Sequence, residues 1–178
     1  NNPKKLLDVG GNTGKWAIQC ANFNNEIEIT ILDHPGQLEK AKKNIDRNGF
    51  SDRIKGIPMN LLDHSIPFPT GFDIVWMSQF LDCFSQKDIL ELLIRAKNAI
   101  NENGSIYILE TYWDKQKYEA STYSLHATSL YFTCLANGCS QMYHSDDMLA
   151  LIDNAGLYVF KELHDIGVSH SLFECKLK

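Results

Sequence analysis

The chain has 178 residues, of which 44% are hydrophobic, 22% charged and 11% aromatic, and its formal net charge is −5. This length suits one domain with a sizeable core. Its uncharged apolar runs, such as residues 74–77, are far shorter than the ~20 residues of a membrane-spanning helix, so we expect no membrane partner. The 17 basic residues are outnumbered by 22 acidic ones. No basic patch is visible, and we expect no nucleic-acid partner.

The five cysteines are odd in number and include no CxxC pair. This pattern is typical of reduced thiols in a cytoplasmic protein, and it suggests no metal site. The chain begins Asn1-Asn2-Pro3 without a methionine or a signal peptide, and it enters an apolar run almost at once. We therefore expect a domain cut from a longer polypeptide.

Apolar runs alternate with amphipathic stretches along the whole chain. The order predicted from the amino end is a strand at 5–9, a helix at 16–20, a strand at 26–32, a helix at 35–48, and strands at 53–58 and 72–77. A helix at 85–103, a strand at 105–110, helices at 118–136 and 145–155, and strands at 157–163 and 170–177 complete the list.

Two helix starts carry recognisable capping residues. Ser85 is followed three residues later by Asp88, as in a capping box, and this helix is expected to stop at Asn103 and Gly104. Ser145 is expected to cap the last helix.

The alternation of strands and helices predicts an α/β fold with a mainly parallel sheet. Only residues 165–169 separate the last two strands, which is too short for a parallel crossover. The sequence therefore predicts a Rossmann-like, seven-stranded, mostly parallel sheet that ends in an antiparallel hairpin, with helices on both faces.

The loop between the first strand and the first helix, residues 8–14, is rich in glycine. In an open α/β sheet, ligands bind beyond the carboxyl ends of the strands. The dinucleotide fingerprint GxGxxG fails here, because Asn12 and Lys15, or Thr13 and Trp16, fall where glycines belong. A phosphate-binding P-loop fails as well, since no GK[ST] follows. The loop reads instead as D-x-G-x-N-x-G.

This segment, LLDVGGNTGKWA, resembles the first motif of class I S-adenosylmethionine-dependent methyltransferases. The resemblance implies the class I methyltransferase fold and S-adenosylmethionine as cofactor. It also implies an acidic residue at the end of the second strand for the ribose hydroxyls, and an acidic or amide residue near the adenine after the third. The cofactor-binding residues implied are Asp8, Gly10, Asn12, Gly14, Asp33, Asn60 and Leu61.

Residues 73–156 resemble more specifically the caffeate- and hydroxyindole-type O-methyltransferases. In that family a histidine after the fourth strand takes the proton of a phenolic hydroxyl, and Asp82 falls at its position. Glu110 matches the family's glutamate at the end of the fifth strand, whereas Ser145 replaces a later catalytic glutamate. The resemblance implies O-methylation of a small aromatic acceptor, with Asp82 and Glu110 as the acid–base or orienting candidates.

The replacement at position 82 changes the proton chemistry. A free phenol has a pKa near 10 and a free aspartate near 4, so full proton transfer to an ordinary carboxylate costs about 8 kcal/mol. Asp82 can serve only if burial raises its pKa or if the acceptor is unusually acidic. His126 and His144 are the alternative bases, and a structural role competes for each of them.

The lost histidine also motivates an alternative function, a relative that binds the cofactor without methylating. A regulatory nucleotide-binding module or an NAD-dependent oxidoreductase is a third class, and the failed GxGxxG argues against the oxidoreductase.

Six of the seven tyrosines lie between residues 107 and 143. They are interpreted either as the aromatic wall of an acceptor pocket or as a core or subunit contact. The family carries a helical N-terminal domain that pairs subunits. The resemblance thus implies that residues 1–178 are the S-adenosylmethionine-binding methyltransferase domain without that part, and that the whole protein is a homodimer.

Overall fold

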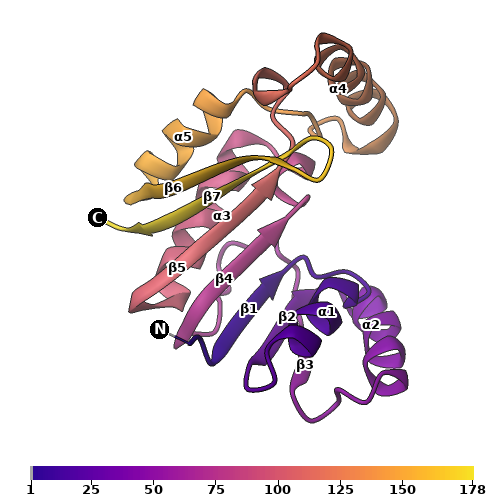
Figure 1. Ribbon diagram of the computed structural model, residues 1–178, viewed down its shortest axis with the longest axis vertical. Coiled ribbons are helices and arrows are strands. Elements are labelled where there is room, and N and C mark those ends of the chain that lie inside the picture. Colours follow the sequence, from indigo (N-terminus) through magenta and orange to yellow (C-terminus); the bar gives the residue numbers. More distant parts are fainter. Residues whose placement is uncertain (1) are drawn as a thin grey trace.

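The computed structural model describes residues 2–178, with every side chain in that range except that of Asn137. Its strands form a seven-stranded sheet in the order β3-β2-β1-β4-β5-β7-β6 (Figure 1). They are β1 (Lys5–Val9), β2 (Glu28–Asp33), β3 (Ile54–Pro58), β4 (Phe72–Ser78), β5 (Ile100–Glu110), β6 (Leu157–Ile166) and β7 (His170–Leu177). The helices are α1 (Lys15–Phe23), α2 (Pro35–Arg47), α3 (Gln86–Ala99), α4 (Glu119–Phe132) and α5 (Ser145–Asn154). Three short turns of helix are η1 (Leu81–Cys83), η2 (Trp113–Lys115) and η3 (Thr133–Asn137).

The strands from β3 to β5 are all parallel, whereas β7 runs antiparallel to both β5 and β6. This confirms the predicted sheet and its terminal hairpin. The antiparallel direction has a consequence for function: the first residues of β7 lie at the edge where the parallel strands end. Ser171, the second residue of β7, pairs with Glu110, the last residue of β5.

Alternate residues of the strands point to opposite faces of the sheet and build two cores. Leu6 packs with α1 and α2 in one cluster, and its neighbour Leu7 packs with α3 and α5 in the other. Both side chains are at most 2% exposed. Helices therefore cover both faces, as predicted.

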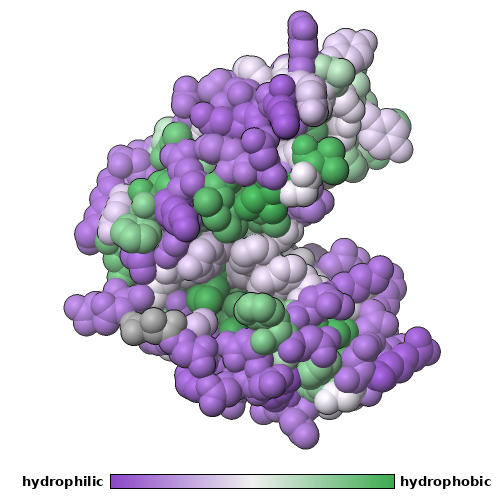
Figure 2. Space-filling model, in the orientation of Figure 1, coloured by the Kyte–Doolittle hydropathy of each residue, from purple (hydrophilic) through white to green (hydrophobic). Residues whose placement is uncertain are grey.

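The face of the sheet that packs against α1 and α2 is only half covered by helices. Helices α1 and α2 cover it over β1, β2 and β3, but Figure 1 shows no helix in front of β4 and β5. Trp76 and Tyr107 on this side are half-buried, whereas Val75 and Met77 on the opposite side are fully buried. Trp16 of α1 stacks on Trp76 with ring centroids 4.3 Å apart. The space-filling view shows this region as a hollow lined by pale and green residues (Figure 2).

The end of α3 differs from the prediction. The helix stops at Ala99 and not at Asn103, and β5 begins at Ile100, which pairs with Phe72. Ser85 is confirmed as the N-cap of this helix, because its hydroxyl accepts the Asp88 N–H at 3.2 Å. Pairing of the apolar Ile100 with β4 ends the helix early, since the following polar residues are poor helix formers.

The predicted role of Ser145 as a helix cap is wrong. The cap of α5 is His144, whose Nδ1 accepts the Asp146 N–H at 3.0 Å. Ser145 is fully buried, and its hydroxyl donates instead to Asp114 Oδ2 at 2.5 Å. The nearby carboxylate is the stronger acceptor partner, so it takes the serine away from the helix end.

Among the described residues, no helix is long and apolar enough to cross a membrane.

Candidate functional site

The glycine-rich loop after β1 turns sharply through three left-handed residues. Gly10, Asn12 and Gly14 have φ angles of 74°, 51° and 72°. A Cβ at Gly10 would lie 2.3 Å from the ring of Phe80, so only glycine fits there. The loop thus presents its backbone at the carboxyl edge of the sheet, where a ligand can approach it closely.

Beneath this loop lies a buried carboxyl group. Asp8 is 3% exposed, and a Cβ at Gly11 would come within 2.5 Å of its Oδ2 atom. That oxygen accepts no hydrogen bond from any described residue. Burial, and then the negative charge of Asp33, raise the pKa of Asp8 to about 7. An unsatisfied buried acceptor of this kind suits a ligand that brings a cationic donor.

Asp33 holds the loop from the neighbouring strand. Its Oδ2 accepts the Asn12 N–H at 2.8 Å and its Oδ1 accepts the His34 N–H at 2.7 Å. Asn44 of α2 adds a hydrogen bond from its amide to the Thr13 carbonyl at 2.9 Å. Each carboxylate oxygen can accept a second hydrogen bond, so Asp33 retains the capacity to bind ligand hydroxyls.

The two predicted residues after β3 have different environments. Asn60 is exposed, and its side-chain oxygen accepts the Leu62 N–H at 3.2 Å. Leu61 is only 4% exposed and belongs to the core. Its carbonyl accepts a hydrogen bond from the buried Arg95 guanidinium at 2.7 Å, and that group lies 4.1 Å from the centre of the Phe68 ring. Contact of Asn60 and Leu61 with a cofactor stays a prediction.

Glu110 organises the turn that follows β4. Its Oε1 accepts the N–H groups of Phe80 and Leu81, both at 2.8 Å. The side chain is 2% exposed. Burial and then the negative charge of Asp82 raise the pKa of Glu110 well above its usual value, against the opposing effect of the two N–H donors. Because Phe80 packs against Gly10, these two hydrogen bonds support one wall of the glycine loop. An acid–base or orienting role of Glu110 toward an acceptor stays a prediction.

A cavity of about 410 Å³ opens where β4 and β5 end and β7 begins. Its polar lining includes Gln79, Asp82, Thr111 and His170. Helix α4 covers it with Leu125, Thr128 and Phe132. A space of this size, part apolar and part polar, suits a small ring compound that carries a hydroxyl.

Asp82 is one of the residues that line this cavity. Burial raises its pKa, against the lowering effects of a hydrogen bond from Cys83 at 3.5 Å and of the positive charge of a protonated His170. Its backbone carbonyl accepts the Gln141 N–H at 2.9 Å, which ties it to the segment before α5.

The two histidines considered from the sequence lie elsewhere. The rings of His126 and His144 pack on Trp113, at centroid distances of 4.8 and 4.6 Å, and neither is in the described cavity lining. His170 is in that lining, and it was not considered from the sequence. The predicted hairpin contained the signal for it, because an antiparallel strand starting at His170 has to begin at the carboxyl edge of the sheet.

The tyrosines between residues 107 and 143 do not wall this cavity, since its described lining includes none of them. Tyr112 is buried and stacks on Phe173 with ring centroids 5.0 Å apart. Tyr123 and Tyr131 are 77% and 60% exposed on α4. The core or subunit-contact interpretation fits these positions better than the pocket interpretation.

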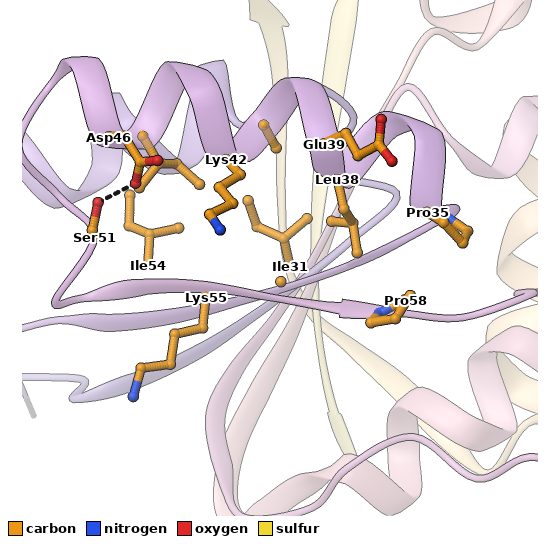
Figure 3. A pocket seen from close by; sticks show the side chains of 13 residues that line it. Ile31, Pro35, Leu38, Glu39, Lys42, Asp46, Ser51, Ile54, Lys55 and Pro58 are labelled. Atoms are coloured by element: carbon orange, nitrogen blue, oxygen red, sulfur yellow. Dashed lines mark hydrogen bonds between the residues drawn. The ribbon is translucent and has the colours of Figure 1, made fainter.

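A second hollow, of about 560 Å³, lies between α2 and the edge strand β3 (Figure 3). Its floor is apolar, with Ile31, Leu38 and Ile54, and the Lys42 side chain lies across it. None of the predicted site residues belongs to its described lining. This groove is therefore separate from the candidate site.

Comparison with known proteins shows the family to which the chain belongs. The O-methyltransferase domain family matches residues 2–160. The chain belongs to this family. The chain is 36% identical over 107 residues to the L-tyrosine C(3)-methyltransferase of Streptomyces lavendulae, a match that covers 60% of this chain and 29% of that protein.

Solved structures share the fold along almost the whole chain. The mitomycin 7-O-methyltransferase MmcR has a TM-score of 0.87 at 20% identity, over 99% of this chain and 49% of that one. The O-methyltransferase NcsB1, solved with S-adenosyl-L-homocysteine and 1,4-dihydroxy-2-naphthoic acid, has a TM-score of 0.82 at 19% identity, over 98% and 49%. This chain therefore spans about half the length of these two solved structures.

Proposed function

We propose that this domain binds S-adenosylmethionine and transfers its methyl group to a hydroxyl oxygen of a small aromatic acceptor. The observation that carries the proposal is the loop over Asp8, which places a buried, unsatisfied carboxylate oxygen under a glycine cradle. The amino group of the cofactor would supply the cationic donor that this oxygen lacks. Membership in the O-methyltransferase domain family and the bound S-adenosyl-L-homocysteine of NcsB1 support the same cofactor.

The residues present fit this cofactor in chain order. Asp8, Gly10, Asn12 and Gly14 would hold its amino-acid part, and Asp33 would accept hydrogen bonds from the ribose hydroxyls. Asn60 and Leu61 would lie toward the adenine. When bound, the cofactor supplies an electrophilic methyl group on a sulfonium sulfur.

The chain's own contribution to the reaction is position and proton control. The cradle and the cavity share one edge of the sheet, because Phe80 packs against Gly10 and lies two residues before Asp82. Methyl transfer is an in-line displacement, so holding the acceptor oxygen at this edge supplies much of the rate. Leu125 and Phe132 on α4 would limit access of water, which strengthens the polar interactions inside.

The test is methyl transfer by the whole protein from labelled S-adenosylmethionine to a panel of phenols and naphthols, with NMR to locate the new methyl group. We expect labelled methyl ethers. Labelled methyl groups on ring carbon, as the name of the tyrosine C(3)-methyltransferase describes for that relative, would contradict O-methylation. Binding of the cofactor with no transfer to any acceptor would favour the non-methylating alternative.

We also propose that residues 1–178 are one domain of a longer, homodimeric protein and that α4 and η3 contribute to its subunit contact. Large apolar side chains are exposed there, including Tyr123 (77%), Leu130 (67%), Tyr131 (60%) and Leu135 (69%). A contiguous exposed apolar patch is typical of an interaction surface. The relatives with known structures are about twice as long as this chain, which leaves room for a second domain.

Light scattering on the whole protein tests the subunit contact. We expect a dimer for the wild type and a monomer for Leu130→Glu. The control is Phe23→Glu, because Phe23 is 95% exposed on α1 and lies outside this patch. A dimer that persists in Leu130→Glu would contradict the assignment.

We place the protein in the cytoplasm, as the odd number of cysteines favours a reducing compartment.

A further inference from the structure

The proposed reaction leaves the fate of the acceptor proton open. The first residue of β7 lines the cavity that we assign to the acceptor. β7 is antiparallel to β5, and its second residue, Ser171, pairs with Glu110 at the last position of β5. His170 therefore lies just beyond the end of β5. Both His170 and Thr111, the residue after Glu110, line the cavity of about 410 Å³.

Asp82 enters the same cavity from the turn after β4. Both side chains line this cavity, and the positive charge of a protonated imidazole at His170 acts to lower the pKa of Asp82. An imidazole and a carboxylate thus line one acceptor-sized space, one from the start of β7 and the other from the turn after β4. This pairing is a common arrangement for general base catalysis, in which the carboxylate orients the imidazole and balances its charge.

We propose that His170 is the general base for the acceptor hydroxyl and that Asp82 is its positioning residue. This inference rests on the proposed methyl transfer. The acceptor O–H bond breaks and its proton moves to a ring nitrogen of His170. The acceptor oxygen then forms its bond to the methyl carbon as the carbon–sulfur bond of the cofactor breaks, and that electron pair stays on sulfur. The imidazolium afterwards returns its proton to water.

Imidazole is the side chain most often used as a general base. The other titratable groups near the cavity are less suited to that role. Cys83 is no competitor, because burial and then the Asp82 charge raise the pKa of its thiol to about 12. On the neighbouring strand β6, Glu162 and His164 lie 3.4 Å apart as a pair of their own, and His164 Nδ1 lies 2.9 Å from the Ser171 hydroxyl.

A base at His170 would also account for the absence of a histidine at position 82. The turn after β4 and the start of β7 lie at the same edge of the sheet, so a base at either place can reach the same cavity. Asp82 then keeps a role at the position of the family's histidine, as the partner of the base.

The first test measures the ionisation of a bound acceptor and needs no turnover. The probe is 1,4-dihydroxy-2-naphthoic acid, the compound bound in NcsB1, and the readout is its absorption spectrum at neutral pH on the whole protein with S-adenosylhomocysteine. We expect the red-shifted naphtholate band in the wild type. In His170→Gln its amplitude should fall at least tenfold, and in Asp82→Asn it should fall by a smaller factor.

The matched control is His126→Gln, the same change on a histidine outside the cavity, and we expect it to keep the wild-type spectrum. Circular dichroism of each variant reports folding, and His170→Asn is the second variant if the glutamine disturbs the hairpin. A naphtholate band that survives both His170 variants, or that only Asp82→Asn removes, would overturn the assignment.

The second test separates this inference from the proposed function. Methylation of the probe by His170→Gln should be at least a hundredfold slower than by the wild type, with unchanged affinity for S-adenosylhomocysteine. Wild-type turnover in His170→Gln would refute the base while leaving the methyltransferase assignment intact. Absence of S-adenosylhomocysteine binding in the wild type would refute the methyltransferase assignment itself.

Discussion

The buried carboxyl under the glycine loop makes a prediction about stability. Burial and the charge of Asp33 raise the pKa of Asp8 from 3.8 to about 7. Between these two pH values the folded protein keeps a proton on Asp8 that the unfolded chain has lost. The free energy of unfolding therefore falls as pH rises through this window and levels off above about pH 7. Three pH units at 1.36 kcal/mol each give about 4 kcal/mol as the upper size of the effect.

The variant Asp8→Asn removes this titration. Urea unfolding of wild type and variant, followed by tryptophan fluorescence from pH 4 to pH 8, gives their difference in free energy of unfolding at each pH. We expect the difference to move by about 2 to 4 kcal/mol in favour of the variant between pH 4 and pH 8. The same variant should bind S-adenosylhomocysteine at least tenfold more weakly, because it lacks the carboxylate. A stability difference that stays constant within about 0.5 kcal/mol over this range would refute the reasoning.

Three further changes probe the support of the site. Gly10→Ala forces a Cβ to 2.3 Å from the Phe80 ring at a φ of 74°, so we expect a loss of at least about 2 kcal/mol in urea unfolding and tenfold weaker S-adenosylhomocysteine binding. Gly36→Ala is its control, since no described atom beyond its chain neighbours and the nearby backbone of its own helix lies within 4 Å of the new methyl group, and it should change the free energy of unfolding by less than about 1 kcal/mol. Glu110→Ala leaves two backbone N–H groups without their acceptor, and it should lower the free energy of unfolding by about 3 kcal/mol. Glu110→Gln keeps an oxygen that can accept these bonds, so it should lower the free energy of unfolding by less than half as much. Arg95→Met removes the hydrogen bond and the ring contact that hold the segment after β3. We expect it to lower the free energy of unfolding by about 2 to 3 kcal/mol in the same urea assay. No measurable change would contradict that role of Arg95.

The sheet was predictable because its signals are local. Runs of β-branched residues, the capping box at Ser85 and the short connection before His170 each depend on a few neighbouring residues. The structure departs from the prediction where a distant partner decides the outcome. Asp114 takes the hydroxyl of Ser145 away from the helix end, and the pairing of Ile100 with β4 shortens α3.

The candidate site divides in the same way. The loop residues and Asp33 follow from the order of motifs, because successive parallel strands end at one edge of the sheet. Gly11, which makes room for Asp8, and Arg95, which holds Leu61, depend on packing between segments far apart in the chain. His170 also comes from a strand far along the chain. The predicted hairpin already implied that this strand begins at the carboxyl edge of the sheet, but not that His170 lines the cavity.

The central claim is that the loop over Asp8 binds S-adenosylmethionine and not a dinucleotide. Isothermal titration calorimetry of the whole protein with S-adenosylhomocysteine and, separately, with NAD tests it most directly. We expect saturable one-to-one binding of S-adenosylhomocysteine that weakens at least tenfold in Gly10→Ala and in Asp8→Asn, and no heat of binding with NAD. Tight binding of NAD, or S-adenosylhomocysteine binding that both variants leave unchanged, would contradict the account.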